Sequence, residues 1–132
     1  MQRSLSVLLP VKDAQATLID SVHRILDSVA DSGERFELLI IDDGSTDATS
    51  EVGHELACHY PQIRMVRHGT PRGREAAIRT GLQLSRGDVV MLRDDASGFS
   101  KLERPSRAAT PIASRPARPN YLNRLRSFAL GE

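Results

Sequence analysis

The sequence has few of the residues that stabilise small extracellular proteins or cross membranes. Its 132 residues include one cysteine, Cys58, no tryptophan, two tyrosines and three phenylalanines. A single cysteine excludes an internal disulfide and favours a reducing compartment. No run of about 18 apolar residues occurs, so no segment is expected to cross a membrane as a helix. With so few aromatic side chains, the core has to be aliphatic.

Three common catalytic and nucleotide-binding motifs are also missing. No Gly-x-Gly-x-x-Gly follows the first apolar run, and no Gly-Lys-Ser/Thr phosphate-binding loop is present. Their absence disfavours a dinucleotide oxidoreductase and a Walker-type NTPase. No Gly-x-Ser-x-Gly elbow occurs either, which disfavours an α/β-hydrolase.

Charge is unevenly distributed along the chain, although the formal net charge is only +1. Residues 1–98 contain 11 basic and 15 acidic side chains, whereas residues 99–132 contain 7 basic and 2 acidic ones. Four of the seven prolines also lie in the second segment. We therefore predict a folded domain over 1–98 and a basic, Pro/Arg-rich, mostly disordered tail over 99–132. Residues 121–130 are a candidate short amphipathic helix within that tail.

Hydrophobic patterning predicts strands that alternate with helices. Apolar runs typical of buried strands occur at 4–10, 36–41, 63–67 and 88–92. Apolar residues at helical spacing occur at 14–32, 48–60 and 74–85. This order predicts an α/β fold: a Rossmann-like, three-layer α/β/α arrangement with a mainly parallel sheet of about four strands. The first run loosely imitates a secretory signal, but Pro10 and Lys12 interrupt it, so we expect a strand there.

Acidic residues gather where the expected strands end. The ends of the first, second and fourth strands carry Lys12-Asp13, Asp42-Asp43 and Asp94-Asp95. Because ligands bind beyond the carboxyl ends of strands in parallel sheets, we expect these clusters to converge at one edge. Adjacent carboxylates such as Asp94 and Asp95 can bind Mg²⁺ or Mn²⁺ together with a diphosphate. The structural alternatives are helix capping at Asp42-Asp43 and a hydrated loop at Asp94-Asp95.

Four segments occur in an order typical of one protein family. They are Val7–Asp13, Ile40–Asp47, Gly73–Leu82 and Arg86–Asp95. Together they resemble the donor-binding half of family 2 glycosyltransferases, which have the GT-A fold. The similarity is greatest to the branch of polyprenyl- and dolichol-phosphate sugar transferases, and it covers residues 4–98.

The resemblance implies a set of nucleotide-sugar-binding residues. They are Pro10, Val11, Asp13, Asp42, Asp43, Arg74 and Asp94. In this interpretation Asp43 accepts a hydrogen bond from the nucleobase, Asp42 supports the ribose, and Asp94 with Asp95 binds Mg²⁺ or Mn²⁺. The implied reaction transfers a sugar from a nucleoside diphosphate sugar to an unknown acceptor, such as a lipid phosphate. The cation neutralises the leaving diphosphate.

The chain also departs from the family's pattern. Lys12-Asp13-Ala14 replaces the usual aromatic-Asn-Glu, and the second Asp of the Asp-x-Asp metal motif falls on Ala96. No residue of 99–132 matches a catalytic base. A second hypothesis is therefore a non-catalytic nucleotide-sugar-binding or remnant domain that lacks the acceptor half.

The basic tail suggests a further contact. Its charge, with a stripe of Leu122, Leu125 and Phe128, can attract an anionic membrane surface or a protein partner. Nucleic acid is not favoured as a partner. We expect a cytoplasmic protein, with peripheral membrane association as an alternative.

Overall fold

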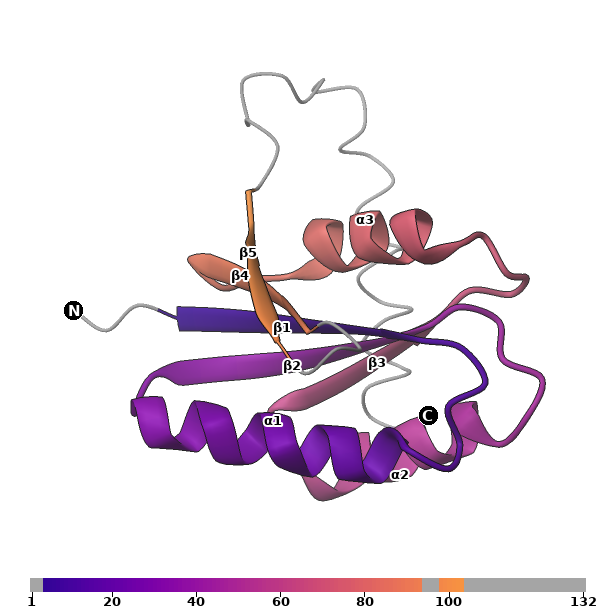
Figure 1. Cartoon of the computed structure of the whole chain (residues 1–132), viewed down its shortest axis with the longest axis horizontal. Coiled ribbons are helices and arrows are strands. Elements are labelled where there is room, and N and C mark those ends of the chain that lie inside the picture. Colours follow the sequence, from indigo (N-terminus) through magenta and orange to yellow (C-terminus); the bar gives the residue numbers. More distant parts are fainter. Residues whose placement is uncertain (1–3, 94–97, 104–132) are drawn as a thin grey trace.

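A computed structural model describes residues 4–93 and 98–103 of the chain (Figure 1). The elements are β1 (Ser4–Val11), α1 (Leu18–Ser32), β2 (Arg35–Asp42), α2 (Thr49–His59), β3 (Ile63–Arg67), α3 (Arg74–Leu84), β4 (Val89–Arg93) and β5 (Phe99–Leu102). The predicted alternation of strands and helices is confirmed. The largest difference in a boundary is at α1, which begins at Leu18 rather than Ala14.

The strands form one mainly parallel sheet in the order β3-β2-β1-β4-β5. β1 pairs with β2 over its whole length, from Ser4 beside Arg35 to Val11 beside Asp42, so the two strands end level. β1 also pairs in parallel with β4. The chain proceeds from β1 outward through β2 to β3 and then returns to the other side of β1. The strand order therefore reverses between β1 and β4, which is where open α/β sheets bind ligands.

A fifth strand was not predicted. β5 pairs antiparallel with β4, whereas the sequence analysis assigned these residues to the tail and expected about four strands. The segment has only four residues, and two of them, Ser100 and Lys101, are polar. A strand at the edge of a sheet is not buried on both faces, so it lacks the continuous apolar run by which the parallel strands were recognised. The rest of the predicted tail, with its helix at 121–130, lies outside the described residues.

Helices cover both faces of the sheet, as the three-layer prediction requires. α1 and α2 lie on one face and α3 lies on the other (Figure 1). Alternate residues of β1 and β2 point to opposite faces, so Val7 and Leu38 pack in the α1–α2 core while Leu8 and Leu39 pack in the α3 core. Within the described residues, no helix has the length and apolar character needed to cross a membrane.

A glycine brings α3 close to the sheet. A Cβ atom at Gly81 would lie 2.8 Å from Leu8 Cδ1 and 3.1 Å from Ile41 Cδ1, so a larger residue would push the helix away. The close packing places the first turn of α3 beside the carboxyl ends of β1 and β2. That position determines the walls of the candidate site.

Candidate functional site

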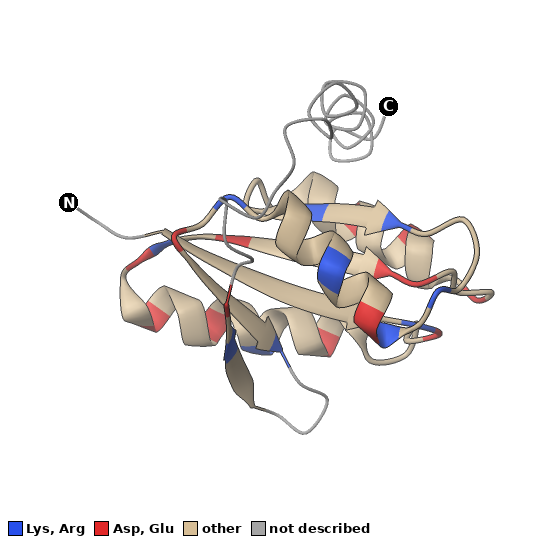
Figure 2. Cartoon of the chain, turned by 90° about the horizontal axis from the view of Figure 1, so that it is seen from above, with Lys and Arg blue, Asp and Glu red and all other residues tan. Residues whose placement is uncertain are grey.

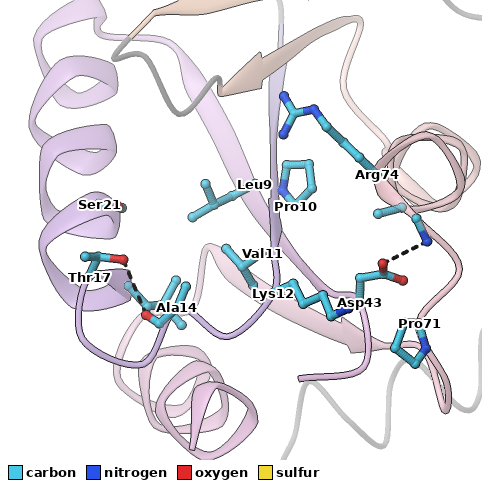
Figure 3. A pocket seen from close by; sticks show the side chains of 13 residues that line it. Leu9, Pro10, Val11, Lys12, Ala14, Thr17, Ser21, Asp43, Pro71 and Arg74 are labelled. Carbon is cyan, nitrogen blue, oxygen red and sulfur yellow. Dashed lines mark hydrogen bonds between the residues drawn. The ribbon is translucent and has the colours of Figure 1, made fainter. Parts of the chain in front are cut away.

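A pocket of about 370 Å³ opens at the carboxyl end of β1, between the first turns of α1 and α3 (Figure 3). Its apolar lining includes Leu9, Pro10 and Val11 from β1 and Ala77 from α3. Its polar lining includes Lys12, Asp43 and Arg74, together with Thr17 and Ser21 from α1. Acidic and basic residues are both present at this end of the molecule (Figure 2). The pocket therefore combines an apolar floor with charged groups of both signs.

The structure brings together four of the residues that the resemblance implies. Pro10, Val11, Asp43 and Arg74 all line the pocket. Asp13 and Asp42 lie next to it but do not line it. Asp94 and Asp95 lie outside the described residues, so their predicted metal site has no geometry here. Within residues 4–93 and 98–103, no group of three or more His, Cys, Asp or Glu side chains is arranged to hold a metal ion.

Asp43 is the acidic group of the pocket and is almost fully buried. Its Oδ1 accepts hydrogen bonds from the Arg72 amide and from His68 Nδ1, both at 2.8 Å, and its Oδ2 accepts one from the Gly73 amide at 2.9 Å. Burial alone would raise the pKa of the Asp43 carboxyl, but these hydrogen bonds together lower it below its ordinary value. Asp43 is therefore an anion at neutral pH. Its Oδ2, with one donor, still has room for another.

Two cations face this carboxylate across the pocket. The Lys12 side chain extends from the end of β1 toward Asp43, and Arg74 extends from the start of α3 toward Pro10 (Figure 3). Among the ion pairs of residues 4–93 and 98–103, none includes Lys12. The sequence analysis treated Lys12 only as a departure from the family's pattern. Its position at the strand end was the signal that it would reach the pocket.

Asp42 has a different environment from its neighbour. Its side chain is completely buried, and its Oδ1 accepts hydrogen bonds from the Ser45 amide at 3.0 Å and the Ser45 hydroxyl at 2.5 Å. Its Oδ2 is buried with no hydrogen-bond partner among the described residues. Asp42 thus holds the turn after β2 from behind, and the surface of the pocket is left to Asp43.

Asp13 joins the loop after β1 to the loop after β2. Its amide donates to the Ser45 hydroxyl at 2.7 Å, and its carboxylate Oδ1 accepts from the Thr46 amide at 2.8 Å. The next residue continues the contact, because the Ala14 amide donates to Thr49 Oγ1 at 2.8 Å. Asp13 has a positive φ of 51°, a conformation that Asp and Asn adopt more readily than most residues. These bonds fix one wall of the pocket.

Replacing Asp13 with alanine is expected to lower the free energy of unfolding by about 1–2 kcal/mol. The variant loses the hydrogen bonds to Thr46 and places a residue that disfavours positive φ at this position. Asp13→Asn retains an acceptor oxygen and tolerates the conformation, so it should lose less than about 0.5 kcal/mol. Urea denaturation of the three proteins measures the difference. Equal losses in both variants would contradict the assignment.

Comparisons with known proteins agree with this geometry. The family model described as Glycosyl transferase family 2 matches residues 6–96. A dolichyl-phosphate beta-glucosyltransferase, ALG5A, of Trichomonas vaginalis is 32% identical, with 75% of this chain and 32% of the relative covered. An undecaprenyl-phosphate 4-deoxy-4-formamido-L-arabinose transferase of Edwardsiella ictaluri is also 32% identical, with 68% of this chain and 28% of the relative covered.

A solved structure shows the same fold. The mannosyltransferase PcManGT of Pyrobaculum calidifontis, in complex with GDP-Man and Mn²⁺, matches with a TM-score of 0.58 and 24% identity, covering 71% of this chain and 28% of that one. At this identity the likeness concerns the fold alone. The chain spans about a third or less of each of these three proteins.

Proposed function

The chain belongs to glycosyltransferase family 2 and has the GT-A fold, and from this premise we propose that its pocket binds the nucleoside diphosphate part of a sugar donor. The protein would thereby take part in transfer of the donor's sugar to an acceptor. One observation carries the proposal: an ionised carboxylate, Asp43, and two cations, Lys12 and Arg74, line one pocket at the carboxyl edge of the sheet.

The nucleobase is assigned to the apolar floor beside Asp43. Pro10 and Val11 offer a surface for a flat ring, and no aromatic side chain lines this pocket. A carboxylate can only accept hydrogen bonds, so Asp43 Oδ2 requires an N–H group on the ligand. Uracil and guanine each carry a ring N–H that satisfies this requirement.

The phosphates are assigned to the two cations. Arg pairs with phosphate oxygens through a planar fork, and Lys binds phosphate as a compact point charge. Arg74 is also the first residue of α3, whose preceding residue Gly73 provides no side-chain cap. The amides of a helix start favour negative charge, which adds to the attraction for a phosphate.

A divalent cation fits the same edge of the sheet. Asp94 and Asp95 directly follow β4, which pairs with β1 in parallel, and carboxylate oxygens are the ligands that Mg²⁺ and Mn²⁺ prefer. We propose Asp94 as a ligand, with Asp95 as the second carboxylate. When bound, the ion would neutralise charge on the leaving diphosphate. The Mn²⁺ in the complex of the Pyrobaculum mannosyltransferase supports this assignment.

The acceptor proposed for the transfer is a lipid phosphate. The support is the dolichyl-phosphate and undecaprenyl-phosphate transferases among the relatives. The basic residues of 99–132 would then favour peripheral contact with an anionic membrane surface of the cytoplasm.

A second candidate is nucleotide-sugar binding without catalysis by this chain alone. Asp43 is the one carboxylate that lines the pocket in the described part of the chain, and its lowered pKa makes it a weak proton acceptor. Glycosyl transfer needs a group that activates the acceptor. The two candidates separate in one assay, because both bind the donor but only the first releases nucleoside diphosphate when a polyprenyl phosphate is added.

Replacing Lys12 with glutamine is expected to weaken binding of UDP or GDP about tenfold, because the variant removes one of the two phosphate-binding charges. Binding of uridine or guanosine should not change, since neither carries a phosphate. Lys12→Arg keeps the charge and should retain most of the affinity. Isothermal titration calorimetry with each ligand provides the measurement. Unchanged affinity for both diphosphates in Lys12→Gln would exclude Lys12 from the phosphate site.

A further inference from the structure

A chain of three buried polar side chains lies behind the pocket. His68 follows β3 and makes two hydrogen bonds: its Nδ1 lies 2.8 Å from Asp43 Oδ1, and its Nε2 lies 2.9 Å from Thr80 Oγ1. All three side chains are more than nine-tenths buried. His68 and Thr80 do not line the pocket, whereas Asp43 does. The chain therefore connects the acidic group of the pocket with the inner face of α3.

The proton positions follow from the partners. Asp43 is ionised and can only accept, so His68 Nδ1 carries the shared proton. In the neutral imidazole the other nitrogen is then an acceptor, and it receives the proton of the Thr80 hydroxyl. Each group in the chain thus has a defined role as a donor or an acceptor, and each bond fixes the orientation of the next side chain.

The order carboxylate, imidazole, hydroxyl is also that of hydrolase triads, but Thr80 cannot act as their nucleophile here. Its side chain faces the sheet from the middle of α3, is 8% exposed, and is not part of the pocket wall. A nucleophile has to reach a substrate. The chain is consequently suited to positioning Asp43, not to attacking a ligand.

We propose that His68 is a positioning residue that holds Asp43 so that Oδ2 is the oxygen left for a ligand N–H. Oδ1 already accepts two hydrogen bonds, from His68 and the Arg72 amide, whereas Oδ2 accepts one. The inference rests on the proposed nucleotide binding and adds a base preference to it. A base with a ring N–H, such as uracil at N3, is accepted. Cytosine, which has a lone pair at N3, is rejected.

His68 is needed because the other partners of Asp43 belong to a single loop. The Arg72 and Gly73 amides lie in the connection from β3 to α3, so on their own they would let Asp43 move with that connection. His68 adds an anchor on β3 and, through Thr80, a second one inside α3. The carboxylate is thereby fixed to three elements.

Two variants with one retained bond each test the proposal. The amide nitrogen of His68→Asn lies where Nδ1 lies and can still donate to Asp43, but it loses Thr80. The amide of His68→Gln reaches the place of Nε2, so it can bond to Thr80 but loses Asp43. Both variants lose the ring and one hydrogen bond, and their thermal stabilities should therefore be similar. The readout is the affinity for UDP and CDP, measured by calorimetry.

We expect His68→Asn to keep the UDP affinity of the wild type within about threefold, and to keep its preference over CDP. In His68→Gln the UDP affinity should fall about tenfold, and the ratio of UDP to CDP affinity should approach one. Equal affinities in the two variants, whether both unchanged or both reduced, would overturn the proposal, because a purely structural histidine predicts no such difference.

A measurement without a ligand separates this inference from the proposed function. If the wild type binds no nucleotide, the proposed function fails, and hydrogen exchange of the Arg72 and Gly73 amides then decides whether His68 positions Asp43. Both amides donate to Asp43 and should exchange faster in His68→Gln than in His68→Asn. Identical exchange rates in the two variants would overturn the positioning role.

Discussion

Replacing Glu37 with alanine is expected to lower the free energy of unfolding by about 3 kcal/mol, the largest loss that we predict for a single side chain. Glu37 lies on β2, and its side chain is 17% exposed. Its Oε1 accepts two hydrogen bonds from the Arg64 guanidinium, at 2.6 and 3.1 Å. Its Oε2 accepts one from the Ser6 hydroxyl at 2.5 Å and one from the Arg86 amide at 2.6 Å.

The loss is large because the partners of Glu37 belong to four different parts of the fold. They come from β1, β3 and the connection between α3 and β4, while Glu37 itself lies in β2. In Glu37→Ala the Arg64 charge stays 14% exposed without its carboxylate. An uncompensated buried charge costs far more than a lost surface contact.

A surface ion pair provides the control. Asp20 and Arg24 pair at 3.0 Å on α1, but their side chains are 70% and 66% exposed. Asp20→Ala should therefore change the free energy of unfolding by less than about 0.5 kcal/mol. Urea denaturation at pH 7 compares both variants with the wild type. Similar losses in Asp20→Ala and Glu37→Ala would contradict a special role of the buried pair.

The contribution of Glu37 should also depend on pH. Burial alone would raise the pKa of Glu37, but hydrogen bonds from Ser6 and Arg86 and the charge of Arg64 together bring it below the ordinary value of 4.5. A carboxyl whose pKa is lower in the folded state stabilises the fold fully above its unfolded pKa, and this stabilisation is lost as the pH falls through the folded value. The stability difference between the wild type and Glu37→Ala should consequently shrink below about pH 4.5.

Asp43→Ala is expected to produce the largest functional loss, a decrease of at least about 100-fold in the affinity for a nucleoside diphosphate. The variant removes the hydrogen bond proposed for the base and also the acceptor that holds the Arg72 and Gly73 amides. Two effects of roughly 1.4 kcal/mol each would give such a factor. Loss of the second contact frees the start of α3, where Arg74 reaches the pocket.

Calorimetry with UDP and GDP measures this effect, and two further variants serve as controls. Asp43→Asn keeps the size of the side chain and one acceptor oxygen, so its affinity should lie between those of the wild type and Asp43→Ala. Asp20→Ala lies on the exposed surface of α1 and should bind like the wild type. Wild-type affinity in a folded Asp43→Ala protein would remove Asp43 from the binding site.

The architecture could be predicted from the sequence because parallel strands are buried on both faces. Leu38–Ile41 is apolar at every position, since Leu38 and Ile40 fill one core while Leu39 and Ile41 fill the other. The stripe of Leu18, Val22, Ile25 and Val29 similarly predicted α1, and all four side chains are buried. Such signals are local, so one sequence is sufficient to recognise them.

The site was only partly predictable because its contacts depend on sheet register and turn geometry. Asp42 and Asp43 are adjacent and chemically identical, yet one is buried behind the turn and the other lines the pocket. His68 meets Asp43 because the register of β2 and β3 pairs Asp42 with Arg67, which places the next two residues side by side. No pattern in the sequence specifies that register. The hydrogen bonds of Asp13 to the loop after β2 were missed for the same reason.

The most direct test of nucleotide binding at this pocket is an NMR titration of the ¹⁵N-labelled full chain with UDP and GDP, because it reports the location of binding as well as its strength. The account predicts that one of the two ligands shifts the amide signals of Lys12, Gly73 and Arg74 in a saturable manner. It also predicts that the exposed surface of α1 around Asp20 stays unchanged. Saturable shifts that map elsewhere, or no shifts with either ligand at millimolar concentration, would contradict it.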